Sequence, residues 1–145
     1  MVHALKEACR VLKPRGILID QRPLSINSPL DIVYRGKSDF VGYLDMTPGW
    51  EHDNAADHAI EILGFSGIVK EVKTVQFQVA YYWKNVRGMI ADIHERWMDD
   101  VIYDEILFKH AYHLFRRHQP LAQVRLIMSM KLVKYKKLGS DEEIK

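Results

Sequence analysis

Asp20 and Arg22 are the first residues of this chain whose types and position suggest chemistry. They follow the apolar residues 17–19 almost directly, so they stand just past the carboxyl end of a predicted strand. Open α/β sheets bind ligands along that edge. We therefore predict that Asp20 and Arg22 contact a substrate. The alternative is a turn in which Asp20 caps local N–H groups and Arg22 pairs with a neighbouring acid.

Aromatic side chains form a second candidate site. Tyr81, Tyr82 and Trp83 end a predicted strand, and Trp97 belongs to the helix predicted after it. Such rings can line a pocket for a flat or apolar ligand, and we name Tyr81 and Trp83 as candidate contacts. The alternative is packing of the strand against the helix, which large aromatic side chains also favour.

The seven histidines do not form a recognisable metal site. His110 and His113 are three residues apart on a predicted helix, but a metal would need a further carboxylate or histidine. The neighbouring cations Arg116 and Arg117 would oppose it. We predict a polar helix face there and no metal. No serine has a Gly-x-Ser-x-Gly setting, so no catalytic residue is assigned.

Composition limits the class of protein. With 145 residues, 48% of them hydrophobic and 28% charged, the chain is typical of one soluble globular domain. A net charge of +2 is too small to imply a polyanion, so we expect no nucleic acid partner. The all-positive stretch 125–137 indicates a solvated strand face, with phosphate or nucleic acid contact as the alternative. The single Cys9 excludes an internal disulfide and fits a reducing cytoplasm. No apolar run is long enough to cross a membrane.

These residues need a scaffold of alternating helices and strands. Residues 2–13 form an amphipathic helix that ends at Pro14, and the strand 17–19 has no alternation, which predicts cover on both faces as in a parallel sheet. Residues 23–49 contain many prolines and glycines, which predicts irregular structure. The later predicted elements are a helix over 50–63 with Gly64 as its cap, a strand over 68–83, two helices marked by residues 86–97 and 102–115, and a strand over 122–135.

Residues 5–20 resemble a motif of a known family. The run Arg10-Val11-Leu12-Lys13-Pro14, followed by Gly16, is similar to the Arg-Val-Leu-Lys-Pro-Gly-Gly pattern of class I S-adenosylmethionine-dependent methyltransferases. In that family the pattern leads into the fifth strand of the sheet, and a reversed seventh strand lies beside it. The resemblance implies an α/β fold: a partial methyltransferase-like Rossmann sheet of about three strands, the last antiparallel, with helices packed on it and a two-helix insert before the last strand.

The resemblance covers only the C-terminal half of a family member. It implies one domain over residues 1–138 with an insert over 84–120, followed by a flexible tail over 139–145. The family's glycine-rich cofactor loop has no counterpart, because the sequence contains no Gly-x-Gly. We therefore expect no cofactor on this chain alone, and S-adenosylmethionine only if an N-terminal half completes it.

The resulting hypothesis is a truncated or split methyltransferase-like protein that is not catalytically competent by itself. Activity as a methyltransferase rests on the resemblance alone. The alternatives are a dimeric interaction module and a small-ligand-binding protein descended from the same fold. The strand 17–19 would lie at an open sheet edge, which favours pairing with another chain. We therefore expect a homodimer or a complementary methyltransferase half as partner.

Overall fold

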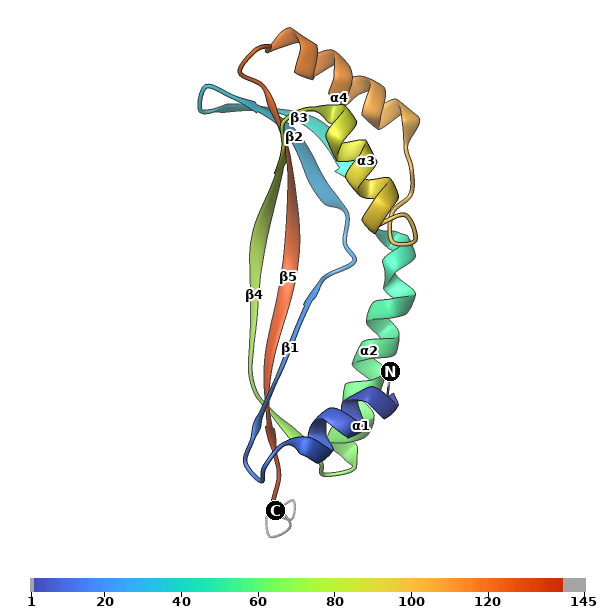
Figure 1. Cartoon of the computed structure of the whole chain (residues 1–145), viewed down its shortest axis with the longest axis vertical. Helices are drawn as coiled ribbons and strands as arrows, with labels where there is room; N and C mark the ends of the chain where they lie inside the picture. The colour runs from blue at the N-terminus through green and yellow to red at the C-terminus, as the bar shows by residue number, and fades with distance from the viewer. Residues whose placement is uncertain (1, 140–145) are drawn as a thin grey trace. The chain divides into compact units, whose positions relative to one another are not determined.

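The computed structural model describes residues 2–139 (Figure 1). In chain order the elements are α1 (Val2–Val11), β1 (Ile17–Pro23), β2 (Ser28–Tyr34), β3 (Lys37–Leu44), a 3-10 helix (Thr47–Gly49), α2 (Trp50–Phe65), β4 (Val69–Trp83), α3 (Val86–Arg96), α4 (Glu105–Arg117) and β5 (Gln123–Lys137). The predicted α/β mixture is confirmed. None of the described helices has the length and apolar run that crossing a bilayer requires. Apart from residue 139, the predicted tail lies outside the described residues.

Five strands form one sheet, in which β5 pairs with β1, β2 and β4, and β2 also pairs with β3. The pairings of β1 with β5, β2 with β5 and β2 with β3 are antiparallel. The start of β4 meets the end of β5, where the Leu138 N–H donates to the Ile68 carbonyl at 3.0 Å. The expected number of about three strands, with β1 in a parallel sheet, was therefore wrong.

The two additional strands come from the stretch predicted to be irregular. β2 and β3 form a hairpin whose two turn residues, Arg35 and Gly36, have φ angles of 46° and 75°. Two positive φ values are the mark of a type I′ turn, whose twist matches that of paired strands. The strands were not predicted because they contain Pro29 and Gly42, and proline and glycine are uncommon in the interior of a strand. At Gly42 the absence of a side chain has a use, since a Cβ there would lie 2.6 Å from Leu107 Cδ1.

Contacts divide the chain into two compact units. Within the described residues, unit 1 comprises residues 2–23, 51–77 and 130–139, and unit 2 comprises residues 24–50 and 78–129. Strands β4 and β5 contribute residues to both units. The predicted single domain over residues 1–138 stays a prediction.

In unit 1, both helices cover the same face of the strands. Cys9 of α1 and Leu63 of α2 are buried together with Val133 and Tyr135 of β5. Leu18 of β1 packs against this core from its strand. The apolar stripes of two amphipathic helices are thus removed from water by one face of the sheet, which is the main stabilising term for such a layer.

The opposite face of β1 is bare. Burial alternates along the strand, and Ile17 and Ile19 are 43% and 51% exposed. The prediction that residues 17–19 are covered on both faces was therefore wrong. Apolar residues without alternation indicate two apolar faces, but only one of the two is covered within residues 2–139.

Unit 2 has its own core, formed by the β2–β3 hairpin, α3, α4 and the first half of β5. Helix α4 packs on β3 and β2, and α3 packs on α4. The buried residues of this core include Leu30, Ile32, Leu44, Met89, Ile93, Phe108, Ala111, Phe115, Val124 and Leu126. In β5 the buried set changes from even positions as far as Met130 to odd positions from Val133, so Leu132 does not continue the predicted alternation.

Helix α2 ends later than predicted. Gly64 lies inside the helix, and the residue with a positive φ is Gly67, at 66°. The Ile68 N–H donates to the Leu63 carbonyl and the Gly67 N–H to the Gly64 carbonyl, both at 3.0 Å. This pair of hydrogen bonds is a Schellman motif with Gly67 as its left-handed residue.

The two glycines give a matched test of this helix end. Gly67→Ala should lower the free energy of unfolding by about 1 kcal/mol, because alanine is strained at positive φ. Gly64→Ala should raise it by about 0.5–1 kcal/mol, because alanine favours the helix and a Cβ at Gly64 has nothing within 4 Å. Urea unfolding of both variants measures these changes. Equal changes of the same sign would contradict the assigned helix end.

Candidate functional site

Arg22 is the centre of a charged network in unit 1. On β1, Asp20 and Arg22 share the face of Leu18 and point toward α2, where the Arg22 side chain is only 13% exposed. Its Nε donates to Asp20 Oδ2 at 3.1 Å, one terminal nitrogen donates to the Asp53 carbonyl at 2.9 Å, and the other donates to Asp57 Oδ1. The guanidinium therefore joins β1 to α2.

Lys131 of β5 completes the network. Its Nζ donates to the same Asp57 Oδ1 at 3.2 Å. Burial raises the pKa of Asp57, but the hydrogen bonds from Lys131 and Arg22 outweigh it and place the pKa below its usual value. One carboxylate on α2 is thus held by cations from two strands.

These contacts are those expected of the ion-paired alternative for Arg22. All three guanidinium nitrogens of Arg22 have acceptors within the protein, so a substrate anion would have to compete with Asp57 and Asp20. Tyr135 lies buried in the same unit, and burial, together with the charge of Asp20, raises its pKa to about 12. Substrate binding by Asp20 and Arg22 stays a prediction.

The aromatic candidates belong to unit 2, whereas Asp20 and Arg22 belong to unit 1. The rings of Tyr81 and Trp83 stack with centroids 6.2 Å apart, and Trp97 meets them edge-on at 5.3 Å and 6.0 Å. The Trp83 Nε1–H donates to Asp92 Oδ2 at 2.9 Å. At these separations the rings fill the space between one another, as the packing alternative expects. Ligand contact by Tyr81 and Trp83 stays a prediction.

The histidines on α4 have separate surroundings. His110 Nδ1 lies 3.0 Å from the Val41 carbonyl, where it fastens α4 to β3. His113 instead faces the surface. Within residues 2–139 no group of three or more His, Cys, Asp or Glu side chains is arranged to hold a metal ion.

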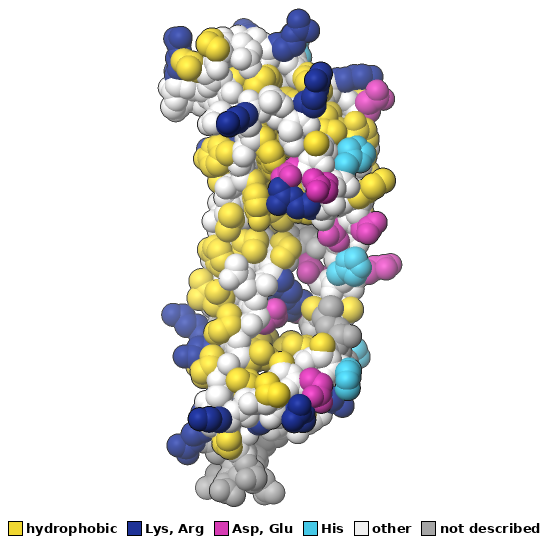
Figure 2. All heavy atoms as spheres, viewed as in Figure 1, with side chains coloured by type: hydrophobic (Ala, Val, Ile, Leu, Met, Phe, Trp, Pro, Cys, Tyr) yellow, Lys and Arg dark blue, Asp and Glu magenta, His cyan; other side chains and the backbone are white. Residues whose placement is uncertain are grey.

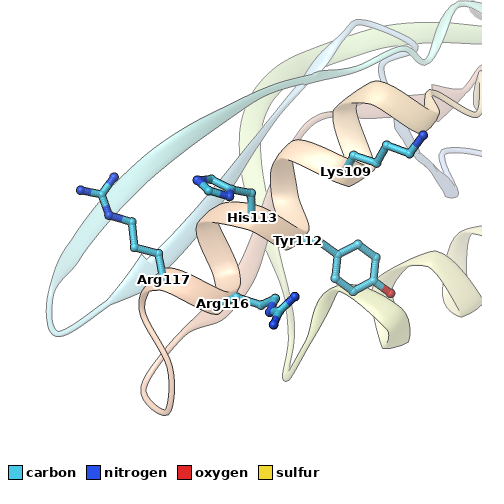
Figure 3. A pocket seen from close by; sticks show the side chains of 5 residues that line it. All are labelled: Lys109, Tyr112, His113, Arg116 and Arg117. Carbon is cyan, nitrogen blue, oxygen red and sulfur yellow. The ribbon is translucent and has the colours of Figure 1, made fainter.

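The feature that sequence reasoning missed is a surface pocket on α4 of about 640 Å³ (Figure 3). Its lining residues are Lys109, Tyr112, His113, Arg116 and Arg117. Tyr112 and Arg116 project to the same side of the helix. The spacing of three, four and seven residues along 109–116 was the available signal, because such residues share a helix face. In the sequence, Arg116 and Arg117 were considered only as cations that oppose a metal, and they were not combined with Lys109 and Tyr112.

A second group that was missed fixes the end of this helix. His118 Nε2 lies 2.7 Å from Asp39 Oδ2, and the Tyr34 hydroxyl donates to Asp39 Oδ1 at 3.0 Å. The rings of Tyr34 and His118 stack 3.6 Å apart at an angle of 7°. The hydrogen bond from His118 lowers the pKa of Asp39. Sequence alone could not pair them, because Asp39 and His118 are 79 residues apart.

Comparison with known proteins gives no relative: no family model, no curated protein and no solved structure matches this chain.

Asp57 gives a pH-dependent test of the network in unit 1. Because its pKa is lower in the folded state, its contribution to stability is present above the unfolded pKa of about 3.9 and is lost as pH falls through the folded pKa. Asp57→Asn should lower the free energy of unfolding at pH 7 by less than about 1 kcal/mol, since the carboxylate is half exposed. Urea unfolding should show this difference shrinking between about pH 5 and pH 2.

Glu61→Gln is the control for that measurement, because Glu61 lies on the same helix with its side chain 65% exposed. It should change stability by no more than about 0.5 kcal/mol at pH 7. A difference between Asp57→Asn and wild type that stays constant down to pH 2 would contradict the network.

Proposed function

We propose that this chain is the C-terminal part of a class I methyltransferase-like fold and takes part in methyl transfer only when another segment completes its sheet. One observation supports this most strongly. In unit 1, β5 lies between β1 and β4, so the last strand of the chain runs antiparallel beside the strand that follows the Arg10–Pro14 motif (Figure 1). This is the position that the resemblance implies for the reversed last strand.

The edge of β1 is where a completing segment would join. Among the described strands β1 pairs with β5 only, which leaves its second edge open. An open edge offers N–H and C=O groups in a row, and these readily pair with another strand. The exposed Ile17 and Ile19 lie beside this edge and would gain cover from an added layer.

The residues present do not fit S-adenosylmethionine on this chain alone. The sequence has no Gly-x-Gly loop, and Asp20, the acid on β1, already accepts a hydrogen bond from Arg22 at 3.1 Å. We therefore derive no methyl-transfer step from these residues. In the proposal, the completing segment supplies the cofactor site.

A homodimeric interaction module is the second candidate, and the same open edge favours it. In this case β1 of a second copy, or α1 beside it, would supply the cover. We also propose a cytoplasmic location, because Cys9 is a free thiol and the only cysteine of the chain.

Ile19→Lys tests both candidates. We would express the tagged full chain in the organism that encodes it, purify it, identify co-purifying polypeptides by mass spectrometry and titrate the purified material with S-adenosylmethionine. For wild type we expect a stoichiometric partner that carries a strand and a glycine-rich loop, together with micromolar binding of S-adenosylmethionine. Ile19→Lys should lose the partner and the binding, because a charge beside the edge opposes its burial.

Ile106→Lys is the matched control, since Ile106 is an 80% exposed isoleucine in unit 2, and it should keep both. A self-dimer in light scattering that Ile19→Lys converts to a monomer would favour the interaction module. A wild-type monomer without a partner would contradict both candidates. Micromolar binding of S-adenosylmethionine to the isolated chain would contradict the absence of a cofactor site.

A further inference from the structure

Cations from two segments meet at one end of unit 2. Arg116 and Arg117 end α4, while Arg35 lies in the turn of the β2–β3 hairpin and Lys37 follows it. The stacked rings of Tyr34 and His118 and the contact of His118 with Asp39 hold the hairpin against the end of the helix. We call these four cations together with Lys109 the basic surface, and Figure 2 shows Lys and Arg side chains gathered over this region.

Little negative charge offsets the basic surface. Among residues 2–139, Arg116 and Arg117 have no ion pair, and Lys109 pairs only with the exposed Glu105, at 3.0 Å. The hydrogen bond from His118 and, to a smaller extent, the charge of Arg117 lower the pKa of Asp39, but both carboxylate oxygens of Asp39 already accept from Tyr34 and His118. The small net charge of the whole chain therefore hides a local excess of positive charge, and it is the local charge that attracts ions.

The geometry of the helix suits a chain of phosphates. Lys109 and Arg116 are two turns apart on α4, or about 10 Å along its axis, so both cations can contact one extended strand. The pocket between them is open to solvent and about 640 Å³ in volume. It is large enough to admit a base as well as its phosphate.

Tyr112 adds a surface on which a base can stack. Tyr112 is 37% exposed and lines the same pocket as Arg116, and its ring has no aromatic neighbour among the described residues. Aromatic rings set among cations are how proteins bind single strands without reading their sequence.

We propose that the basic surface binds single-stranded nucleic acid, with Lys109, Arg116 and Arg117 on the phosphates and Tyr112 stacked on a base. A duplex keeps its bases stacked inside, so it would use the cations but not the tyrosine. This inference is independent of the methyltransferase proposal, because every residue in it belongs to unit 2.

Fluorescence anisotropy with a labelled 20-nucleotide oligothymidine tests the proposal on the full chain. We expect a Kd between about 1 and 100 µM at 150 mM salt, weakening as salt rises. Arg116→Ala combined with Arg117→Ala should weaken binding about tenfold or more. The slope of log Kd against log salt should fall by about 1.4, which is the value for two lost phosphate contacts on a single strand.

Tyr112→Leu should weaken binding about fivefold or more without changing the salt slope, because it removes stacking and no charge. The matched control is Lys70→Ala combined with Lys73→Ala, which removes the same charge from exposed positions of β4 and should change Kd less than twofold. Urea unfolding of each variant verifies that it is folded.

Four results would overturn the proposal. The first two are that the oligothymidine does not bind at 50 mM salt, or that the lysine control weakens its binding as much as the arginine variant does. The other two are that a 20-base-pair duplex binds more tightly than the single strand, or that the protein binds vesicles of phosphatidylserine and phosphatidylcholine but not the oligonucleotide. Unchanged affinity of a folded Tyr112→Leu variant would overturn the stacking on Tyr112.

Discussion

Strand β5 is the element on which the rest of the structure depends. It pairs with β1, β2 and β4, and the sheet contains no pairing outside β5 except that of β2 with β3 in the described residues. Its buried side chains enter both cores, at even positions as far as Met130 and at odd positions from Val133. A strand that must satisfy two cores is constrained at almost every residue, since a shift of one residue would exchange buried and exposed side chains.

The charged groups of the two units are used in different ways. In unit 1, Asp57 of α2 accepts hydrogen bonds from Arg22 of β1 and Lys131 of β5. These ion pairs connect the helix to the two strands. In unit 2, Arg116 and Arg117 extend from α4 to opposite sides of the helix, and neither forms an ion pair within residues 2–139. Charges that are satisfied inside a protein maintain its fold, whereas a local excess of one sign is available for a partner.

Periodicity predicted the helices and the two long strands well. The apolar spacing in α1, α2, α3 and α4 and the alternation in β4 each contain enough residues to define a face. The hairpin could not be predicted in this way, because Pro29 and Gly42 break the pattern and the turn at Arg35 and Gly36 lacks the asparagine or aspartate that usually marks it.

The site residues show a different limit of sequence reasoning. The position of Arg22 after an apolar strand suggested a ligand, but its partner Asp57 lies 35 residues away, and only tertiary structure brings the two together. Conversely, the helical spacing of Lys109, Tyr112 and Arg116 was visible in the sequence. The sequence placed Tyr112 with the apolar residues of this helix, whereas the structure buries Phe108, Ala111 and Phe115 and leaves Tyr112 on the exposed side.

The pairing of β1 with β5 also determines when unit 1 can form during synthesis. The hydrogen bond from Lys137 Nζ to the Leu12 carbonyl joins residues 125 positions apart. At a translation rate of about 5–20 residues per second, α1 and β1 wait about 6 to 25 seconds for their partner strand. Leu18 has no cover from β5 during that interval, and contacts this distant in sequence form slowly even once β5 has been made. The face of β1 that packs into the core of unit 1 is therefore exposed to water for seconds after its synthesis.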